Sequence, residues 1–382
     1  MTKCLQLARM FHSLGDRIIV VETPLYQYCG TRFSTATDKF YVIPSIEENS
    51  ENYQSALIEI AEQEKVDLFV PVASPGAAVV DAMAKPLFPS HTMVFHFDSA
   101  IVKQLDDKHQ FLMLCREFGL SAPESYLINN KESLLTHEFS SDKKFILKKI
   151  AYDPVYRMDL RTLPHPGWKD RVKALPISEK DQWVLQEFIE GDEICTHTTT
   201  INGDTNLFVC SNSSPFQVNY AMQHLPQVEE WTKTFVQKLG ATGQISFDFI
   251  IKKNGDVMPI ECNPRTHSAI TLFHNQPEAA KAYYPSKSQH KIYKPDEASG
   301  HTYWLFHELY RLITAGTLKR FQSILTRIWT GKEAIFSWSD PWPFWIHNFL
   351  HVPYQLLKRT ARGISWTKID FNIGKLIVKG GD

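Results

Sequence analysis

Two carboxylates and one amide lie close together in the segment QISFDFIIKKNGDVMPIECNPR, residues 244–265. Its Asn254-Gly255 dipeptide is the strongest short signal for a hairpin with a two-residue turn. With that turn, Asp248 lies directly opposite Glu261, and Asn263 follows two residues later on the same face. An odd number of residues in the turn would break this register. The other face is then apolar and consists of Phe247, Phe249, Ile251, Met258, Ile260 and Cys262.

Opposed carboxylates repel each other, at a cost of up to about 1 kcal/mol, unless a cation lies between them. A hard divalent ion with oxygen ligands removes that conflict. We therefore predict that Asp248, Glu261 and Asn263 bind Mg²⁺, with Mn²⁺ as the alternative ion. The competing interpretation is a solvated acidic face on an ordinary hairpin.

Cations that could bind phosphates also occur at defined points of the sequence. A Mg²⁺ ion held by few protein carboxylates usually binds substrate phosphates as well. Lys108 opens an expected helix, Lys148 follows an apolar run, and Arg265 comes directly after the metal candidates. Each of these alone would be interpreted as a surface charge, but their order along the chain suggests one shared phosphate site.

The first elements of the chain alternate between helix and strand. Apolar spacing predicts this alternation at residues 2–14, 17–21, 53–64 and 67–72. It indicates a doubly wound, Rossmann-like α/β unit over residues 1–98. Because the sequence begins inside a helix, we expect a sheet that lacks its first, central strand, or a natural start upstream of Met1.

From residue 106 onward the elements change. We expect helices at 107–118 and 229–239, with strands at 144–150, 183–188, 195–201, 207–211 and within 244–262. Residues 153–173 are rich in Arg, Pro and Lys and are expected to form a mobile loop.

The order of these motifs resembles the ATP-grasp superfamily, and the resemblance covers residues 99–275. Asp107-Lys108 resembles the family's lysine before the first helix of its central domain. Leu147-Lys148 resembles its lid-strand lysine, which meets the α-phosphate. The resemblance implies that ATP is the cofactor, that Lys108 and Lys148 bind it, and that Lys148 and Arg265 are catalytic. The family's metal motif is matched by Asp248, Glu261 and Asn263-Pro264-Arg265.

The run QEFIEGDE, residues 186–193, resembles the hinge of that family. There the hinge backbone grips adenine, and a downstream glutamate binds the ribose. The resemblance implies that Glu187, Phe188 and Ile189 contact adenine and that Glu193 binds ribose.

The lid loop departs from the family pattern. The family commonly has a glycine-rich loop whose backbone N–H groups cradle phosphates, but no glycine occurs between Lys148 and Gly167. If the loop closes over ATP, side chains such as Arg157 must supply the contacts. The alternative for Arg157 is a surface charge.

The residues after the metal strand should face the group that accepts phosphate; they are Thr266, His267 and Ser268. The alternative is that they are ordinary buried polar residues. The run ECNPRTHSAIT, residues 261–271, and the ending IDFNIGKL, residues 369–376, resemble the mycosporine-glycine synthases. This resemblance implies that ATP phosphorylates an enolic oxygen of 4-deoxygadusol, a cyclohexenone. Glycine then displaces phosphate and gives mycosporine-glycine.

Two other functions are compatible with the same sequence. An ATP-grasp ligase could phosphorylate a carboxylate and form an ordinary amide, because sequence alone does not separate a vinylogous acid from a carboxylic acid. A nucleotide-binding protein without turnover would be expected to lack one or more of the metal ligands, whereas all three candidate ligands are present.

Composition limits the remaining classes. The 382 residues carry 41 Lys and Arg against 42 Asp and Glu, a net charge of −1. That balance argues against binding nucleic acid through bulk charge. The six cysteines include no closely spaced pair, which favours free thiols in a reducing, cytoplasmic setting. No apolar stretch is long enough for a membrane span, and a homo-oligomer is compatible with the sequence.

The sequence thus predicts three domains of the α/β class. They are a Rossmann-like pre-ATP-grasp domain at 1–98, an α+β ATP-grasp domain at 99–285 with its lid at about 144–190, and a helical appendage at 286–382. Six of the nine tryptophans lie beyond residue 300. We expect the segment 338–357 to pack its aromatic residues against the ATP-grasp domain; a membrane-surface segment or a partner-binding patch are the alternatives.

Overall fold

The N-terminal region of the computed structural model alternates helices and short parallel strands. The structure describes residues 1–72, 75–151, 153, 156, 159–213, 219–285, 291–361, 363, 366–370 and 375–378. Its first elements are α1 (Thr2–Ser13), β1 (Ile19–Glu22), β2 (Lys39–Val42), α2 (Ser50–Glu64), β3 (Leu68–Phe69), α3 (Pro75–Ala84) and β4 (Met93–Val94). The predicted helices and strands of this region are confirmed, although β3 is only two residues long.

The parallel strands of this region do not join into one sheet. β1 pairs with β2 and β3 pairs with β4, and each pair is a separate two-stranded sheet. The expectation of an abbreviated sheet with a gap between its strands is therefore confirmed for the described residues.

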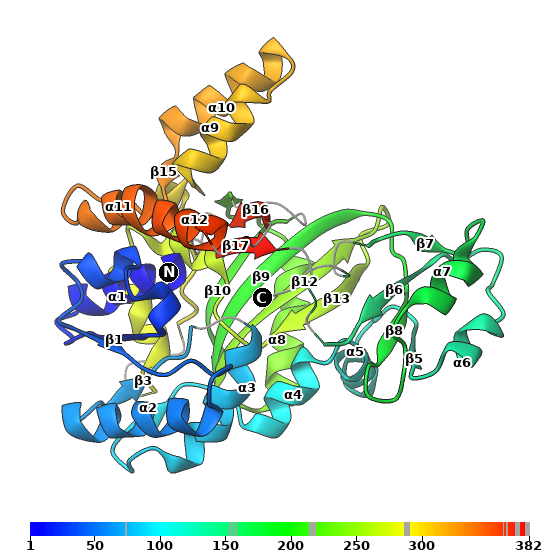
Figure 1. Ribbon diagram of the computed structural model, residues 1–382, viewed down its shortest axis with the longest axis horizontal. Helices are drawn as coiled ribbons and strands as arrows, with labels where there is room; N and C mark the ends of the chain where they lie inside the picture. Colours follow the sequence, from blue (N-terminus) through cyan, green and yellow to red (C-terminus); the bar gives the residue numbers. More distant parts are fainter. Residues whose placement is uncertain are drawn as a thin grey trace.

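A four-stranded antiparallel sheet forms the centre of the molecule (Figure 1). Its order is β10-β9-β12-β13, with β9 at Asp192–Ile201, β10 at Asp204–Asn212, β12 at Gly243–Ile251 and β13 at Val257–Asn263. Helices α4 (Ser99–Asp106), α5 (Lys108–Glu117) and α8 (Pro226–Leu239) pack on one face of it. Phe111, Phe235 and Phe247 meet between these helices and the sheet, with ring centroids 5.0–5.9 Å apart. This aromatic core fixes the strands whose other face carries the predicted site.

A second four-stranded antiparallel sheet lies at the end of the molecule, in the order β5-β8-β6-β7 (Figure 1). Its elements are β5 (Ser125–Ile128), α6 (Lys131–Leu135), β6 (Phe145–Lys149), β7 (Thr162–Leu163), α7 (Trp168–Ala174) and β8 (Trp183–Glu187). This lid sheet has its own core around Phe145, Leu147 and Trp183. It includes β5, which precedes the predicted lid. The segment expected to be a loop contains β7 and α7, because Leu163 and Val172 are buried in the lid core.

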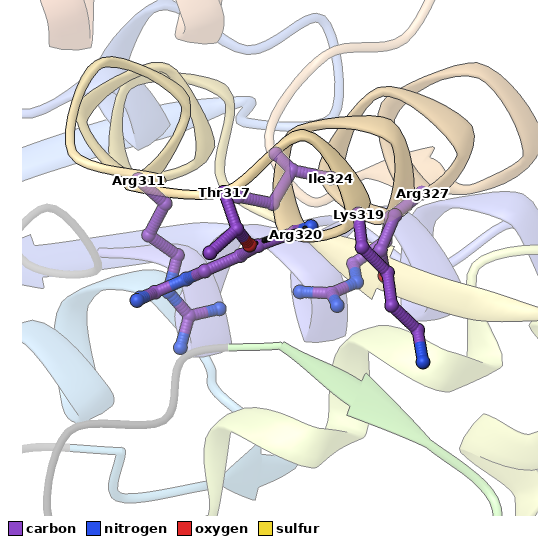
Figure 2. Close-up of a pocket in the computed structure, with 7 residues that line it drawn as sticks. Arg311, Thr317, Lys319, Arg320, Ile324 and Arg327 are labelled. Atoms are coloured by element: carbon purple, nitrogen blue, oxygen red, sulfur yellow. Dashed lines mark hydrogen bonds between the residues drawn. The ribbon is translucent and has the colours of Figure 1, made fainter.

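The C-terminal region adds helices and two small sheets. β11 (Tyr220–Ala221), β14 (His301–Tyr303) and β15 (Lys332–Glu333) form a three-stranded sheet, and β16 (Trp366–Asp370) pairs with β17 (Lys375–Val378). Between them lie α9 (Leu305–Ile313), α10 (Leu318–Thr330), α11 (Trp342–Ile346), a π-helical turn (His347–His351) and α12 (Val352–Ala361). The hairpin of α9 and α10 projects from the body in Figure 1, and Figure 2 shows the charged side chains of one of its sides.

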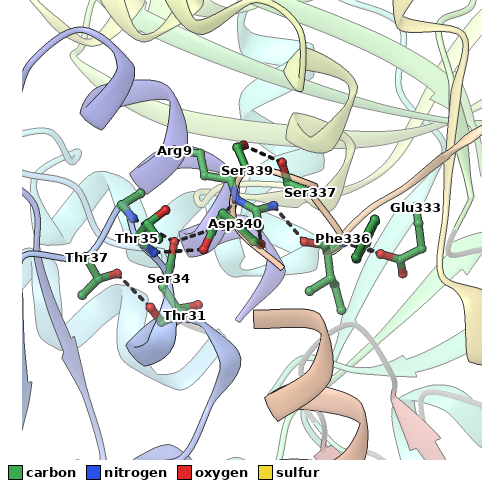
Figure 3. A network of polar contacts seen from close by, with 12 residues as sticks. Arg9, Thr31, Ser34, Thr35, Thr37, Glu333, Phe336, Ser337, Ser339 and Asp340 are labelled. Carbon is green, nitrogen blue, oxygen red and sulfur yellow. Dashed lines mark hydrogen bonds and ion pairs between the residues drawn. The ribbon is translucent and has the colours of Figure 1, made fainter. Parts of the chain in front are cut away.

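A polar network centred on the buried Asp340 joins the N-terminal and C-terminal regions (Figure 3). Arg9 donates through Nε to Asp340 Oδ2 at 2.9 Å and to the backbone carbonyls of Ile335 and Asp340. Ser34 Oγ and the Thr35 backbone N–H donate to the same carboxylate, at 2.6 and 2.9 Å. One aspartate of the C-terminal region is therefore bound by two separate segments of the N-terminal region.

The expected packing of the late aromatic residues is only partly correct, because some of them are exposed and others contact the N-terminal region, as His351 does with Tyr26 and Tyr354 with Tyr28. Phe344, His347 and Val352 are buried, and Phe344 joins a core cluster with residues of α1. By contrast, Trp338 is 89% exposed and Trp342 is 60% exposed. Within the described residues, none of the helices is both long and apolar enough to cross a membrane.

Candidate functional site

The hairpin of β12 and β13 places Asp248 opposite Glu261 and Ser246 opposite Asn263, as predicted. The predicted two-residue turn is wrong. Closer to the turn, Ile251 pairs with Val257 and Ile250 with Met258. The loop between them, residues 252–256, therefore has an odd number of residues. A β-bulge between Asp248 and Phe249 shifts the register by one residue and restores the predicted opposition.

The bulge changes which residues lie on the apolar face. Phe247, Phe249 and Cys262 belong to the aromatic core, as predicted, and Val257 joins them. Met258 and Ile260, predicted for the same face, are not part of that core. Met258 pairs with Ile250, which lies two residues from Asp248 and therefore on the same side of β12. The carboxylates thus have apolar neighbours on their own face.

Asn263 and Arg265 are held beside Asp248 by hydrogen bonds. Asn263 Nδ2 donates to Asp248 Oδ2 at 3.4 Å, and the Arg265 guanidinium donates to Asn263 Oδ1. Arg265 also forms an ion pair with Asp106 at 3.4 Å. The candidate catalytic arginine is therefore oriented by the candidate metal ligand and by the end of α4.

The two lysines reach the same place from other elements. Lys108, at the start of α5, donates to the backbone carbonyl of Ile150, just beyond β6, at 3.1 Å. Lys148, on β6 of the lid sheet, is half-buried, and partial removal from water lowers its pKa. The charges of Glu261 and Asp248 raise that pKa, and the charge of Lys108 lowers it. The lid lysine is therefore within electrostatic range of the carboxylates of the central sheet.

The carboxylates of the site repel one another. Burial raises the pKa of Asp248 to about 8, and Glu261 and Glu193 add to the shift. Lys148 and Arg265 oppose it only in part. Burial also raises the pKa of Glu193, on β9, while a hydrogen bond from Ser213 Oγ at 3.2 Å lowers it. The site thus has an unbalanced concentration of oxygen donors, which a bound cation would stabilise.

The hinge connects the two sheets at the site. Glu187 ends β8, and its carboxylate accepts a hydrogen bond from the Glu124 backbone N–H at 3.0 Å. The Phe188 N–H donates to the Lys144 carbonyl at 2.8 Å, and Ile189 is buried. Gly191 lies so close to β12 that a Cβ there would be 2.1 Å from the Ile251 carbonyl oxygen. Only glycine lets the hinge pack this tightly.

The three residues expected to face the phosphate acceptor lie beyond Arg265. Thr266 is buried, and its hydroxyl donates to Gln244 Oε1 at 2.6 Å. His267 caps the 3₁₀ helix η5 (Ser268–Phe273) by accepting from the Ala269 N–H at 3.2 Å, and burial lowers its pKa to about 3. Ser268 is buried at the start of that helix. Their contacts are internal, and their role toward an acceptor stays a prediction.

One predicted site residue is not described by the structure, and two residues that contact the site were not predicted. Arg157 lies outside the described residues. Asp106 and Ser213 were missed by the sequence argument, although they contact Arg265 and Glu193. The signal for Asp106 was its place two residues before Lys108, while nothing in the sequence around Ser213 indicated its contact.

In the described part of the chain, no group of three or more His, Cys, Asp or Glu side chains could hold a metal ion. The predicted set differs from such a group because its third member is an amide. Asp248, Glu261 and Asn263 meet on one face of the hairpin, with Glu193 close enough to affect Asp248. Metal binding by this set remains a prediction.

Comparison with known proteins identifies the fold. No family model matches the sequence, and no curated protein matches it by sequence. Among solved structures, an L-amino acid ligase from Bacillus licheniformis is 14% identical with a TM-score of 0.54, over 71% of this chain and 67% of that one. N5-carboxyaminoimidazole synthetase from Staphylococcus aureus, complexed with ADP, is 12% identical with a TM-score of 0.54, over 71% and 70%.

A third solved structure extends the likeness. The biotin carboxylase domain of 2-oxoglutarate carboxylase from Hydrogenobacter thermophilus, in complex with MgADP and bicarbonate, is 12% identical with a TM-score of 0.55. The match covers 78% of this chain and 69% of that one. At this identity the likeness establishes the fold alone: the chain has the ATP-grasp fold, of the mixed α/β class.

Proposed function

We propose that this protein is an ATP-dependent ligase that forms a carbon–nitrogen bond and releases ADP and phosphate. The observation that carries the proposal is the convergence of Lys148 from the lid sheet on Glu193, Asp248 and Glu261 of the central sheet. Two of the similar structures are complexes with MgADP and with ADP, which supports ATP as the cofactor of this protein.

The donor set suits Mg²⁺. Asp248 and Glu261 lie opposite each other on neighbouring strands, and the pKa of Asp248 is raised by burial first and by repulsion from Glu261 second. Oxygen donors in this arrangement match a hard divalent ion. When bound, such an ion would neutralise phosphate charge; Asp248, Glu261 and Asn263 would hold it.

Each of the three cations of the site, Lys108, Lys148 and Arg265, would have a separate part in the mechanism. Phosphoryl transfer needs alignment and charge neutralisation more than covalent help from the protein. Lys148, half-buried on a strand, would neutralise the nucleotide phosphates together with Lys108. Arg265, oriented by Asp106 and Asn263, would stabilise the charge on the transferring group.

The hinge would hold the nucleoside. The backbone of Glu187, Phe188 and Ile189 would bind adenine, and Glu193 would bind the ribose. Met258, on the same face as Asp248, offers an apolar surface for the purine ring.

For the acceptor we propose 4-deoxygadusol. ATP phosphorylates its enolic oxygen, and the amine of glycine then displaces phosphate to give mycosporine-glycine, ADP and phosphate. Support comes from the likeness of residues 261–271 and 369–376 to the mycosporine-glycine synthases. Thr266, His267 and Ser268 would line the acceptor side, and protonation of His267 is disfavoured because burial lowers its pKa to about 3.

A second candidate is a ligase that phosphorylates a carboxylate and forms an ordinary amide through an acyl phosphate. The fold likeness to the L-amino acid ligase of Bacillus licheniformis favours it. The two candidates share the ATP site and differ only in the acceptor.

An ADP-release assay separates these candidates. Purified protein is given Mg²⁺-ATP, glycine and 4-deoxygadusol, and each component is omitted in turn. Release that requires all of them supports the proposal. Release with amino acids alone indicates the amide ligase, and no release with any acceptor, despite ATP binding, indicates a nucleotide-binding protein without turnover.

Replacement of Glu261 tests the metal set. We expect Glu261→Ala to abolish ADP release that depends on both substrates, because one of two opposed carboxylates is lost. Asp256→Ala is the matched control, since Asp256 is an exposed carboxylate near the turn of the same hairpin. Retained turnover in Glu261→Ala would contradict the metal assignment.

A further inference from the structure

The α9–α10 hairpin projects from the body and contributes little to the core (Figure 1). The two helices are joined by residues 314–317, where Gly316 has a φ of +71°. In α10 the one buried residue is Ile324, and in α9 it is Glu308. Packing against the rest of the protein therefore does not explain why the chain forms this pair of helices.

One side of the hairpin is an exposed apolar surface. Leu318, Phe321, Leu325 and Trp329 recur at three- and four-residue spacing, so they share one face of α10. Leu318 is 72% exposed and Trp329 90% exposed, and Ile313 at the tip is 86% exposed. Contiguous apolar surface of this kind marks an interaction site on a soluble chain.

The other side of the hairpin is basic. Figure 2 shows Arg311, Lys319, Arg320 and Arg327 along a pocket of about 430 Å³, which Thr317 and Ser323 also line. The single acid of residues 305–330 is Glu308. It is fully buried and is already paired with Arg311 at 3.0 Å and Arg327 at 3.3 Å. The surface of the hairpin therefore carries an excess of positive charge and no exposed carboxylate.

We propose that the α9–α10 hairpin docks this protein on an anionic lipid surface. The apolar face and the tip enter the boundary of the acyl chains, while the cations contact lipid phosphates. Amphipathic helices with Trp, Phe and Leu opposite Lys and Arg bind membrane interfaces in this way. Anionic lipid adds attraction for each Lys or Arg near the surface.

Two other occupants fit the hairpin less well. A second copy docking hairpin to hairpin would bring two surfaces of like charge together. A protein partner would have to supply a pocket for each anchor residue, whereas Ile313 and Leu318 stand at the tip of a projecting helix pair. Lipid needs no such complementary shape.

Vesicle sedimentation of the full chain tests the proposal. One arm uses phosphatidylcholine vesicles, and the other uses equimolar phosphatidylcholine and phosphatidylglycerol. We expect binding to the second only, reduced by salt at about 1 M because screening then acts within roughly 3 Å. The double variant Lys319→Gln/Arg320→Gln should bind about thirtyfold more weakly, and Leu318→Ser should also bind more weakly.

Matched controls use exposed residues elsewhere. Lys169→Gln/Lys180→Gln and Leu87→Ser make the same changes away from the hairpin and should bind like the unaltered protein. Circular dichroism checks that each variant is folded. The proposal is overturned if the anionic vesicles are not bound, or if the hairpin variants bind them as well as the controls do. A dimer that forms without lipid and is lost in Leu318→Ser would identify a second copy as the occupant and would also overturn it.

Discussion

Lys148 and Lys149 are neighbours on β6 with different surroundings. Lys148 is half-buried and within electrostatic range of the carboxylates of the central sheet, and its partial removal from water lowers its pKa. Lys149 forms ion pairs with Asp181 at 3.1 Å and Asp153 at 3.4 Å. Successive side chains on a strand point to opposite faces, so one lysine is available to the site and the other stabilises the lid.

This contrast provides a prediction for Lys148. Because Lys148 would form charge-assisted hydrogen bonds to phosphate, each typically about 1.5–3 kcal/mol, Lys148→Met should weaken ATP binding roughly ten- to hundredfold. Titration calorimetry with Mg²⁺-ATP measures this. Lys149→Met is the matched control and should leave the affinity nearly unchanged. Equal losses in both variants would show that general disruption of the lid, rather than the site contact, is responsible.

At the scale of elements, the hinge and the central sheet are in direct contact. The Gly191 position has no room for a Cβ, because the nearest atoms belong to the backbone of Ile251. The backbone of a central strand yields less readily than a flexible side chain. The position of the hinge relative to β12 is therefore set by one glycine.

We expect Gly191→Ala to displace the hinge and to weaken nucleotide binding more than it lowers overall stability. Calorimetry and thermal unfolding of the same variant separate the two effects. Gly76→Ala is the control, because a Cβ at Gly76, on helix α3, meets no atom within 4 Å. That control should be neutral or slightly stabilising, by up to about 1 kcal/mol. Unchanged ATP affinity in Gly191→Ala would contradict the role given to the hinge.

Helices α2 and α3 are joined by a buried hydrogen bond whose acceptor titrates near neutral pH. Tyr53 donates to Asp81 Oδ1 at 2.8 Å, and burial raises the pKa of Asp81 from 3.8 to about 7. Between pH 3.8 and about pH 7, the carboxyl group of Asp81 is therefore protonated in the folded chain and ionised in the unfolded chain. Stability must therefore fall as pH rises from about 4 to about 7.

Asp81→Asn should remove this pH dependence, because the amide oxygen still accepts from Tyr53 and carries no charge. At pH 8 the variant should be more stable than the unaltered protein, by up to roughly 4 kcal/mol. At pH 4 the two should be similar. Urea unfolding at both pH values measures the difference, and a variant that is less stable at pH 8 would refute the argument.

At the scale of the whole molecule, the N-terminal and C-terminal regions are bound together. Asp340 accepts from Arg9, Ser34 and the Thr35 backbone, as Figure 3 shows. Burial lowers the pKa of Arg9, and Asp340 opposes that shift. Removal of the carboxylate would leave a largely buried guanidinium and two other donors without their acceptor.

Asp340→Ala should therefore lower the free energy of unfolding by about 3–5 kcal/mol. Asp170→Ala is the control, because its ion pair with Lys173 is on the surface, with the Asp170 side chain 87% exposed. It should change stability by less than about 1 kcal/mol. Urea unfolding of both variants measures the difference, and a loss below about 1 kcal/mol for Asp340→Ala would show that the network is not a stabilising link.

The sequence alone determined the central features of this protein. The two-residue side-chain period of a strand and the Asn254-Gly255 signal predicted that Asp248 and Glu261 lie opposite each other. The structure has this opposition because a bulge compensates for the odd loop. The order of Lys108, Lys148 and the hinge indicated the ATP-grasp fold. These features depend on local pattern and chain order.

Tertiary structure decided what local pattern does not encode. The bulge beside Asp248 moved Met258 to the site face, since register depends on how the two strands pair as well as on the turn. The contacts of Asp106 with Arg265 and of Asp340 with Arg9 join residues far apart in sequence. The exposure of Trp329 and Trp338 was likewise not predictable. Hydrophobicity reports the tendency of a residue to be buried, and only the folded chain determines whether another surface is present to cover it.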